Sequence, residues 1–258
     1  MNSLAVTAPV GPAGAPVLVL GPSLGTSTIL WESVIPMLAR THRVVAWDLP
    51  GHGASAPAVE PFSVADLADA VAATMTGLGI DVFRYAGVSL GGAVGLELML
   101  RHPALVDRAA ILCSGAAIGT PEGWRDRAAQ VRAQSTSSLI IGSAQRWFAP
   151  GSIAEHPDVT GRLLHALQDA DDESYARCCE ALAGYDVRGE LASILVPVLA
   201  LWGEHDQVTP ESAAREIADG VRDGRVAGVD GASHLAPVDS PESVALALHD
   251  FLNERSRS

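Results

Sequence analysis

A serine at position 89 lies in a pattern typical of an activated nucleophile. Residues 87–91 follow G-x-S-x-G, after a predicted strand and before an apolar helix. The chain must reverse direction here, so side chains in place of Gly87 and Gly91 would collide with the neighbouring strand and helix. The helix also points free N–H groups and the positive end of its dipole at the serine. We predict that Ser89 attacks an acyl carbon; the alternative is a glycine-rich turn whose serine only caps the helix.

Two later side chains could activate this serine. A serine hydroxyl is a weak nucleophile and needs an adjacent base that a third group holds in place. His234 follows the last predicted strand, and Asp206 lies on the loop after the strand before it. Such loops meet at one edge of a parallel sheet, and the order Ser, acid, His is the one that this motif uses. We predict His234 as the base and Asp206 as the acid that orients it; Glu204 and Asp230 are weaker candidates.

Hydrolysis through a serine also needs two donors for the negative charge that develops on the carbonyl oxygen. The backbone N–H of Leu90, directly after the serine, is the first candidate. The loop after the first predicted strand, residues 21–25, supplies the second, and we assign it to the N–H of Leu24.

Alternating strands and helices must position these residues. Short apolar runs predict the strands, and an apolar period of 3.6 predicts the helices. The strands are residues 17–20, 43–47, 83–88, 108–113, 196–202 and 225–229, and the helices are residues 64–78, 93–100, 211–218 and 241–252. This alternation predicts an α/β fold with a doubly wound, mostly parallel sheet. Helical patterns from 121 to 188 predict a cap inserted after Cys113, with a core of residues 1–118 and 190–258 and a cap of residues 119–189.

The composition limits the partners and the compartment. The 258 residues are 48% hydrophobic, enough for one well-packed domain. A net charge of −13 argues against nucleic acid and anionic membranes, and no apolar run is long enough to cross a bilayer. Without a recognisable secretory signal, and with Cys178 next to Cys179, we expect a cytoplasmic protein with reduced thiols that pack in a cap helix. No Cys/His spacing suggests a metal, and no cofactor is expected.

These features resemble the α/β-hydrolase fold and, within it, the 3-oxoadipate enol-lactonases of bacterial aromatic catabolism. The resemblance covers nearly the whole chain, including the loop at 23–26 and the turn at 87–92. More specific are three segments of the predicted cap, because caps diverge quickly between substrate classes: residues 117–124, 146–148 and 175–181. The short N-terminal segment suggests that a first edge hairpin is missing.

The resemblance implies a small anionic substrate, a five-membered enol lactone bearing a carboxymethyl group. All 17 basic residues are arginine, so a guanidinium must hold the carboxylate. If the segment after Pro121 is helical, Arg127 and Trp124 share one face and offer a bidentate fork beside a flat apolar wall. Arg146 and Trp147 are the second candidates, and we favour Trp147 alone because adjacent residues diverge on a helix. The commoner fate of such arginines is to lie in water, paired with acids.

Other functions use the same residues. A broad carboxylesterase or a perhydrolase would carry the same three catalytic groups, but an enzyme for neutral esters needs no buried arginine. A ligand receptor on a hydrolase scaffold is a non-enzymatic alternative, against which the complete set of catalytic groups argues. The sequence does not give the oligomeric state.

Overall fold

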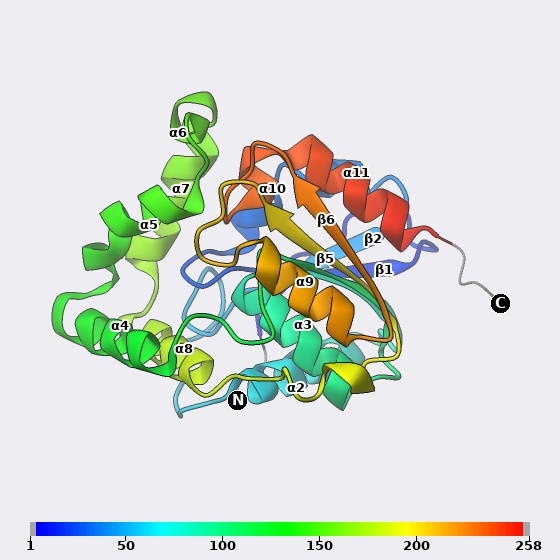
Figure 1. The fold of residues 1–258 in the computed structure, drawn as a ribbon, viewed down its shortest axis with the longest axis horizontal. Helices are drawn as coiled ribbons and strands as arrows, with labels where there is room; N and C mark the ends of the chain where they lie inside the picture. Colours follow the sequence, from blue (N-terminus) through cyan, green and yellow to red (C-terminus); the bar gives the residue numbers. More distant parts are fainter. Residues whose placement is uncertain (1–3, 255–258) are drawn as a thin grey trace.

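The computed structural model describes residues 4–254, and its sheet has six parallel strands in the order β2-β1-β3-β4-β5-β6 (Figure 1). The strands are β1 (Val17–Gly21), β2 (Arg43–Ala46), β3 (Phe83–Val88), β4 (Val106–Leu112), β5 (Pro197–Gly203) and β6 (Asp223–Val229). The apolar runs of β1 to β5 are buried because helices cover both faces of the sheet, whereas the edge strand β6 is mostly half-buried. The doubly wound α/β architecture predicted from the sequence is confirmed.

The strand order reverses beside β1, since β2 lies on one side of it and β3 on the other. Gly21 at the end of β1 is in register with Gly87 of β3. The loops that leave these two strands therefore start side by side at the carboxyl edge, where doubly wound sheets bind ligands. These loops carry Leu24 and Ser89, so the topology itself brings the two residues together.

Helices pack on the two faces of the sheet (Figure 1). On one face lie α2 (Val64–Gly77), α3 (Leu90–Arg101) and α9 (Glu211–Gly220), and on the other lies α11 (Pro241–Leu252), with the short α1 (Ile35–Leu38) packed against it. A capping box opens α2: Ser63 Oγ accepts from the N–H of Asp66, and the Asp66 carboxylate accepts from the N–H of Ser63. None of the helices within residues 4–254 is long and apolar enough to cross a membrane.

A group of helices comes between β4 and β5 in the chain. In space, it lies on the side of the sheet toward which the arrows of β5 and β6 point (Figure 1). They are α4 (Pro121–Gln134), α5 (Ile140–Trp147), α6 (Ser152–Glu155), α7 (Pro157–Asp169) and α8 (Asp172–Ala183). All fall within residues 119–189, the stretch predicted as the cap, whose exact boundaries remain a prediction. We call this group the cap.

Several short local features, among them α1, were not predicted as elements. The N-terminal segment makes isolated antiparallel bridges at Val6 with Trp47 and at Val10 with Val44, in place of a full strand. A single helical turn, α10 (Ala236–Asp239), directly follows His234.

Candidate active site

Ser89 lies at a tight turn between β3 and α3. Its backbone has φ 54° and ψ −115°, a conformation that residues with side chains rarely adopt. A Cβ on Gly87 would lie 2.3 Å from the carbonyl oxygen of Gly91, and one on Gly91 would lie 2.6 Å from that of Pro22. Close approach of the backbone therefore requires both glycines, for the reason predicted from the sequence.

Of the two predicted oxyanion donors, Leu90 directly follows Ser89 in the chain, and Leu24 lines the same pocket as Ser89. Leu90 is the first residue of α3, where backbone N–H groups have no partner within the helix. Leu24 lies on the loop after β1, and its N–H donates no hydrogen bond within residues 4–254. Gly25 beside it has φ 81°, and a Cβ there would lie 2.8 Å from Leu167 of the cap. The loop is thus packed under the cap in a conformation that favours glycine.

His234 and Asp206 form a buried pair. Nδ1 of His234 lies 3.0 Å from Oδ2 of Asp206. The carboxylate also accepts hydrogen bonds from the N–H groups of Val208 and Thr209 and from the Thr209 hydroxyl. Burial alone raises the pKa of Asp206, but the electrostatic attraction of His234 and these hydrogen bonds outweigh it, so the pKa lies below its ordinary value. The ionised carboxylate engages Nδ1 of the ring and leaves Nε2 for proton transfer.

The two weaker candidates for the acid lie elsewhere. Glu204 is exposed and accepts a hydrogen bond from the N–H of Gly231 at 2.8 Å. Asp230 is exposed as well. Of the three acids considered, Asp206 is the one paired with His234.

Core and cap together enclose a pocket of about 260 Å³ that Ser89 and His234 line. The three predicted substrate-binding residues line it from the cap: Trp124, Arg127 and Trp147. The expectation that Trp147 faces the site without Arg146 is wrong, because both line the pocket. Adjacent residues differ by about 100° around a helix, and a long arginine side chain in the last turn of α5 still reaches the cavity.

Two arginines line this pocket without an acidic partner. Within residues 4–254, neither Arg127 nor Arg146 forms an ion pair with Asp or Glu, although eight other arginines do. The Arg127 guanidinium carbon lies 5.0 Å from the ring centre of Trp124, in agreement with their predicted shared face. Burial and the nearby Arg127 lower the pKa of Arg146. Two half-buried cations that repel each other are costly unless an anion binds between them.

Sequence reasoning missed other parts of the pocket wall. Tyr175 and Gln207 line the pocket, together with the turn at residues 118–120. Tyr175 stacks on the buried His52 with ring centres 6.0 Å apart, and burial raises the pKa of the Tyr175 hydroxyl. Tyr175 belongs to the segment 175–181, which carries part of the family resemblance, so the sequence did draw attention to it. No motif pointed to Gln207.

Cys178 and Cys179 are buried free thiols in α8, within the cap. Burial raises the pKa of Cys178, and it raises that of Cys179 to about 12, so both are poor nucleophiles. Among residues 4–254, no group of three or more His, Cys, Asp or Glu side chains is arranged to hold a metal ion.

A serine on a strand–turn–helix motif, beside a buried His–Asp pair, is the arrangement expected of a serine hydrolase on a doubly wound sheet. Residues 16–241 match the alpha/beta hydrolase fold, and the chain belongs to that family. The predicted fold class is thus confirmed.

Within this family the chain is similar to 3-oxoadipate enol-lactonases, as predicted. 3-Oxoadipate enol-lactonase 2 of Acinetobacter baylyi is 33% identical over 233 residues, which are 90% of this chain and 87% of the relative. The crystal structure of the enol-lactonase from Burkholderia xenovorans LB400 matches with a TM-score of 0.94 and 31% identity, over 97% of this chain and 96% of its own. Pimeloyl-[acyl-carrier protein] methyl ester esterase of Neisseria meningitidis is 28% identical over 235 residues, 88% of this chain and 89% of the relative. The family and these relatives make the chain a hydrolase.

Proposed function

We propose that the protein hydrolyses 3-oxoadipate enol-lactone to 3-oxoadipate. The observation that carries the proposal is the pair Arg127 and Arg146, which share a pocket with Ser89 and have no acidic partner within residues 4–254. The carboxylate of this substrate would give the two guanidinium groups the anionic partner that they lack. The substrate is a small ring, and the pocket of about 260 Å³ suits a small ligand. Similarity to two proteins named enol-lactonases supports the same substrate.

The first step of the proposed mechanism forms a tetrahedral intermediate on Ser89. Ser89 Oγ attacks the lactone carbonyl carbon while Nε2 of His234 takes the hydroxyl proton. Asp206 holds the imidazole and stabilises the imidazolium that forms. The N–H groups of Leu24 and Leu90 donate to the carbonyl oxygen as it becomes an oxyanion.

The later steps open the ring, leave an acyl-enzyme on Ser89 and then release the acid. Collapse of the tetrahedral intermediate breaks the ring C–O bond and expels an enol oxygen, which is a better leaving group than an alkoxide. His234 returns its proton to this oxygen, and the enol becomes the ketone of a 3-oxo acyl chain on Ser89. A water molecule, deprotonated by His234, then attacks the ester carbonyl. The second tetrahedral intermediate breaks its bond to Ser89 Oγ, which takes the proton back from His234, and 3-oxoadipate is released. The guanidinium groups hold the remote carboxylate throughout, while Trp124 and Trp147 offer apolar walls for the ring.

The proposed substrate places the protein in the β-ketoadipate pathway of aromatic-compound catabolism. We propose a cytoplasmic location, which the free thiols of Cys178 and Cys179 support because adjacent reduced cysteines suit a reducing compartment.

The direct test follows the loss of ultraviolet absorbance as the purified protein opens 3-oxoadipate enol-lactone. We expect kcat/KM for the lactone to exceed that for neutral p-nitrophenyl acetate by at least about tenfold, because a neutral ester cannot use the arginines. Turnover of the neutral ester without turnover of the lactone would support the second candidate, a broad carboxylesterase or perhydrolase, to which the similarity to a methyl ester esterase points. No turnover, and no labelling of Ser89 by a fluorophosphonate, would support a ligand receptor.

A further inference from the structure

The backbone of the cap is hydrogen-bonded to both chain neighbours of His234. The N–H of Leu235 donates to the carbonyl oxygen of Trp147 at 2.9 Å. On the other side, the Ser233 hydroxyl lies 3.3 Å from the carbonyl oxygen of Arg146. Arg146 and Trp147 line the pocket, so the segment that forms part of its wall also contacts the loop that carries the base.

Asp239, at the end of α10, joins the same two segments through a side chain. Its Oδ2 accepts hydrogen bonds from the N–H of Ser233 at 2.8 Å and from the N–H of Ala149 at 3.1 Å. One carboxylate oxygen thus spans from the residue before His234 to the cap. The other oxygen, Oδ1, is buried. Burial raises the pKa of the Asp239 carboxyl group, and the contact of this group with the buried Ser152 hydroxyl of the cap acts against that shift.

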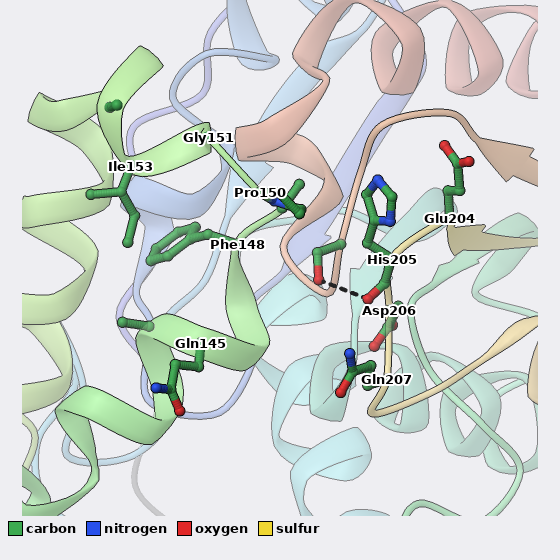
Figure 2. Close-up of a pocket in the computed structure, with 13 residues that line it drawn as sticks. Gln145, Phe148, Pro150, Gly151, Ile153, Glu204, His205, Asp206 and Gln207 are labelled. Atoms are coloured by element: carbon green, nitrogen blue, oxygen red, sulfur yellow. Dashed lines mark hydrogen bonds between the residues drawn. The ribbon is translucent and has the colours of Figure 1, made fainter.

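These hydrogen bonds matter because a cavity separates cap and core next to them. About 780 Å³ of space lies between Phe148 and Ile153 of the cap and residues 204–207 after β5 (Figure 2). Ser233 lies at the wall of this cavity, and its hydroxyl also lies 3.3 Å from the carbonyl oxygen of His205, the contact drawn as a dashed line in Figure 2. Because side chains do not pack across this cavity, the hydrogen bonds at its edge hold the cap segment in position relative to the loop that carries His234.

We propose that Asp239 is a positioning residue, which fixes the His234 loop against the cap segment at residues 146–149. Asp239 is absent from the wall of the pocket and acts through Ser233 and Ala149. Without it, two buried N–H groups lose their acceptor, and the base and the pocket wall are free to shift relative to Ser89. A displacement of about 1 Å in a catalytic group can cost on the order of a hundredfold in rate. The inference rests on the assignment of Ser89 and His234, and it is independent of the lactone.

Two substitutions separate geometry from charge. In Asp239→Asn the amide oxygen still accepts both N–H groups, and the new NH₂ group takes the place of Oδ1 and can donate to the Ser152 hydroxyl. In Asp239→Ala both acceptors are lost. We expect Asp239→Ala to lower the rate of Ser89 labelling by a fluorophosphonate, and kcat for p-nitrophenyl acetate, by about tenfold or more. Asp239→Asn should stay within about threefold of the natural protein.

Stability alone would not produce this pattern. The matched control is Asp66→Ala, which also removes a carboxylate that accepts two hydrogen bonds, from Ser63 at the start of α2. All variants are assayed well below their unfolding temperatures, and rates are normalised to the folded fraction from circular dichroism. We expect Asp66→Ala to label at the natural rate. Asp239→Ser, whose shorter side chain cannot reach both N–H groups, replaces Asp239→Ala if that variant does not fold.

Equal labelling rates for folded Asp239→Ala and the natural protein would overturn the proposal. So would an Asp239→Asn variant as slow as Asp239→Ala, because charge would then matter more than the shared acceptor. If the lactone is not turned over but the labelling pattern holds, the proposed function fails while the positioning role stands.

Discussion

Ser89, His234 and Asp206 come from three loops at one edge of the sheet, and in the proposed mechanism each contributes to a single proton transfer. Their energetic contributions are therefore not additive. We expect Ser89→Ala and His234→Ala each to reduce kcat by about 10⁶-fold, as in other serine hydrolases, while Asp206→Ala costs about 10⁴-fold. The measurement is kcat on the lactone and on a neutral ester, with circular dichroism to show that each variant folds. Substantial lactone turnover by Ser89→Ala would rule out this serine as the nucleophile.

A second prediction at the scale of residues concerns the arginines in the pocket. Removing a charge-assisted hydrogen bond costs about 1.5–3 kcal/mol, which is roughly ten- to a hundredfold in affinity. Arg127→Met and Arg146→Met should each raise KM for the anionic lactone by about that factor and barely change hydrolysis of p-nitrophenyl acetate. Arg125→Met is the matched control, since Arg125 is exposed on the same helix as Arg127 and does not line the pocket.

The neutral ester distinguishes the ways in which the arginine prediction can fail. Equal losses on both substrates would indicate a misfolded cap. An unchanged KM for the lactone in both variants would remove the arginines from substrate binding, and with them the main support for an anionic substrate.

At the scale of elements, local signals made the strand–turn–helix around Ser89 predictable. Neighbouring backbone comes so close at positions 87 and 91 that only glycine fits there, and the sequence shows both glycines. The loops of Asp206 and His234 were predictable as well, since parallel strands bring their carboxyl ends to one edge. Helix α10 was not, because a single turn such as Ala236–Asp239 is too short to show a period. Whether Arg146 lines the pocket depends on how α5 packs against α7, which no local pattern specifies.

Helix α8 gives a prediction for an element whose role is packing. Cys178 and Cys179 are buried there, and burial raises the pKa of both thiols. We expect the double variant Cys178→Ala/Cys179→Ala to keep the natural kcat when folded, while each lost sulfur atom costs about 1 kcal/mol of stability through the small cavity it leaves. An aromatic disulfide reagent should react slowly with the native protein and quickly in denaturant. Complete loss of activity in a stably folded double variant would show that these thiols do more than pack.

At the scale of the whole molecule, the charge balance and the burial of titratable groups decide how the fold responds to acid. The net charge of −13 and a pI of about 4.9 make the chain anionic above pH 5.5. His52 is buried, and its Nδ1 lies 2.9 Å from the carbonyl oxygen of Pro50, to which it donates. Its Nε2 is buried with no hydrogen-bond partner within residues 4–254. Burial lowers the pKa of His52 to about 4.

The sign of the resulting pH dependence follows from proton uptake. Between pH 6.5 and 4 the unfolded chain binds a proton on His52 that the folded protein does not bind, so the free energy of unfolding falls as the pH falls. Relative to pH 7, the His52 contribution at pH 5.5 should be lower by about 1 kcal/mol, because the unfolded histidine is then mostly protonated. This value depends little on how far below 5.5 the pKa of the folded state lies.

Urea unfolding at pH 7.0, 6.5, 6.0 and 5.5 tests this prediction against two variants. His52→Asn can still donate to the Pro50 carbonyl oxygen but does not titrate, so its free energy of unfolding should fall by about 1 kcal/mol less than that of the natural protein over this range. His165→Gln, on the exposed face of α7, is the control and should follow the natural protein. Because both variants keep the other buried groups, including Asp48 and Asp239, the difference isolates His52. Parallel curves for His52→Asn and the natural protein would mean that His52 can be protonated in the folded state without cost.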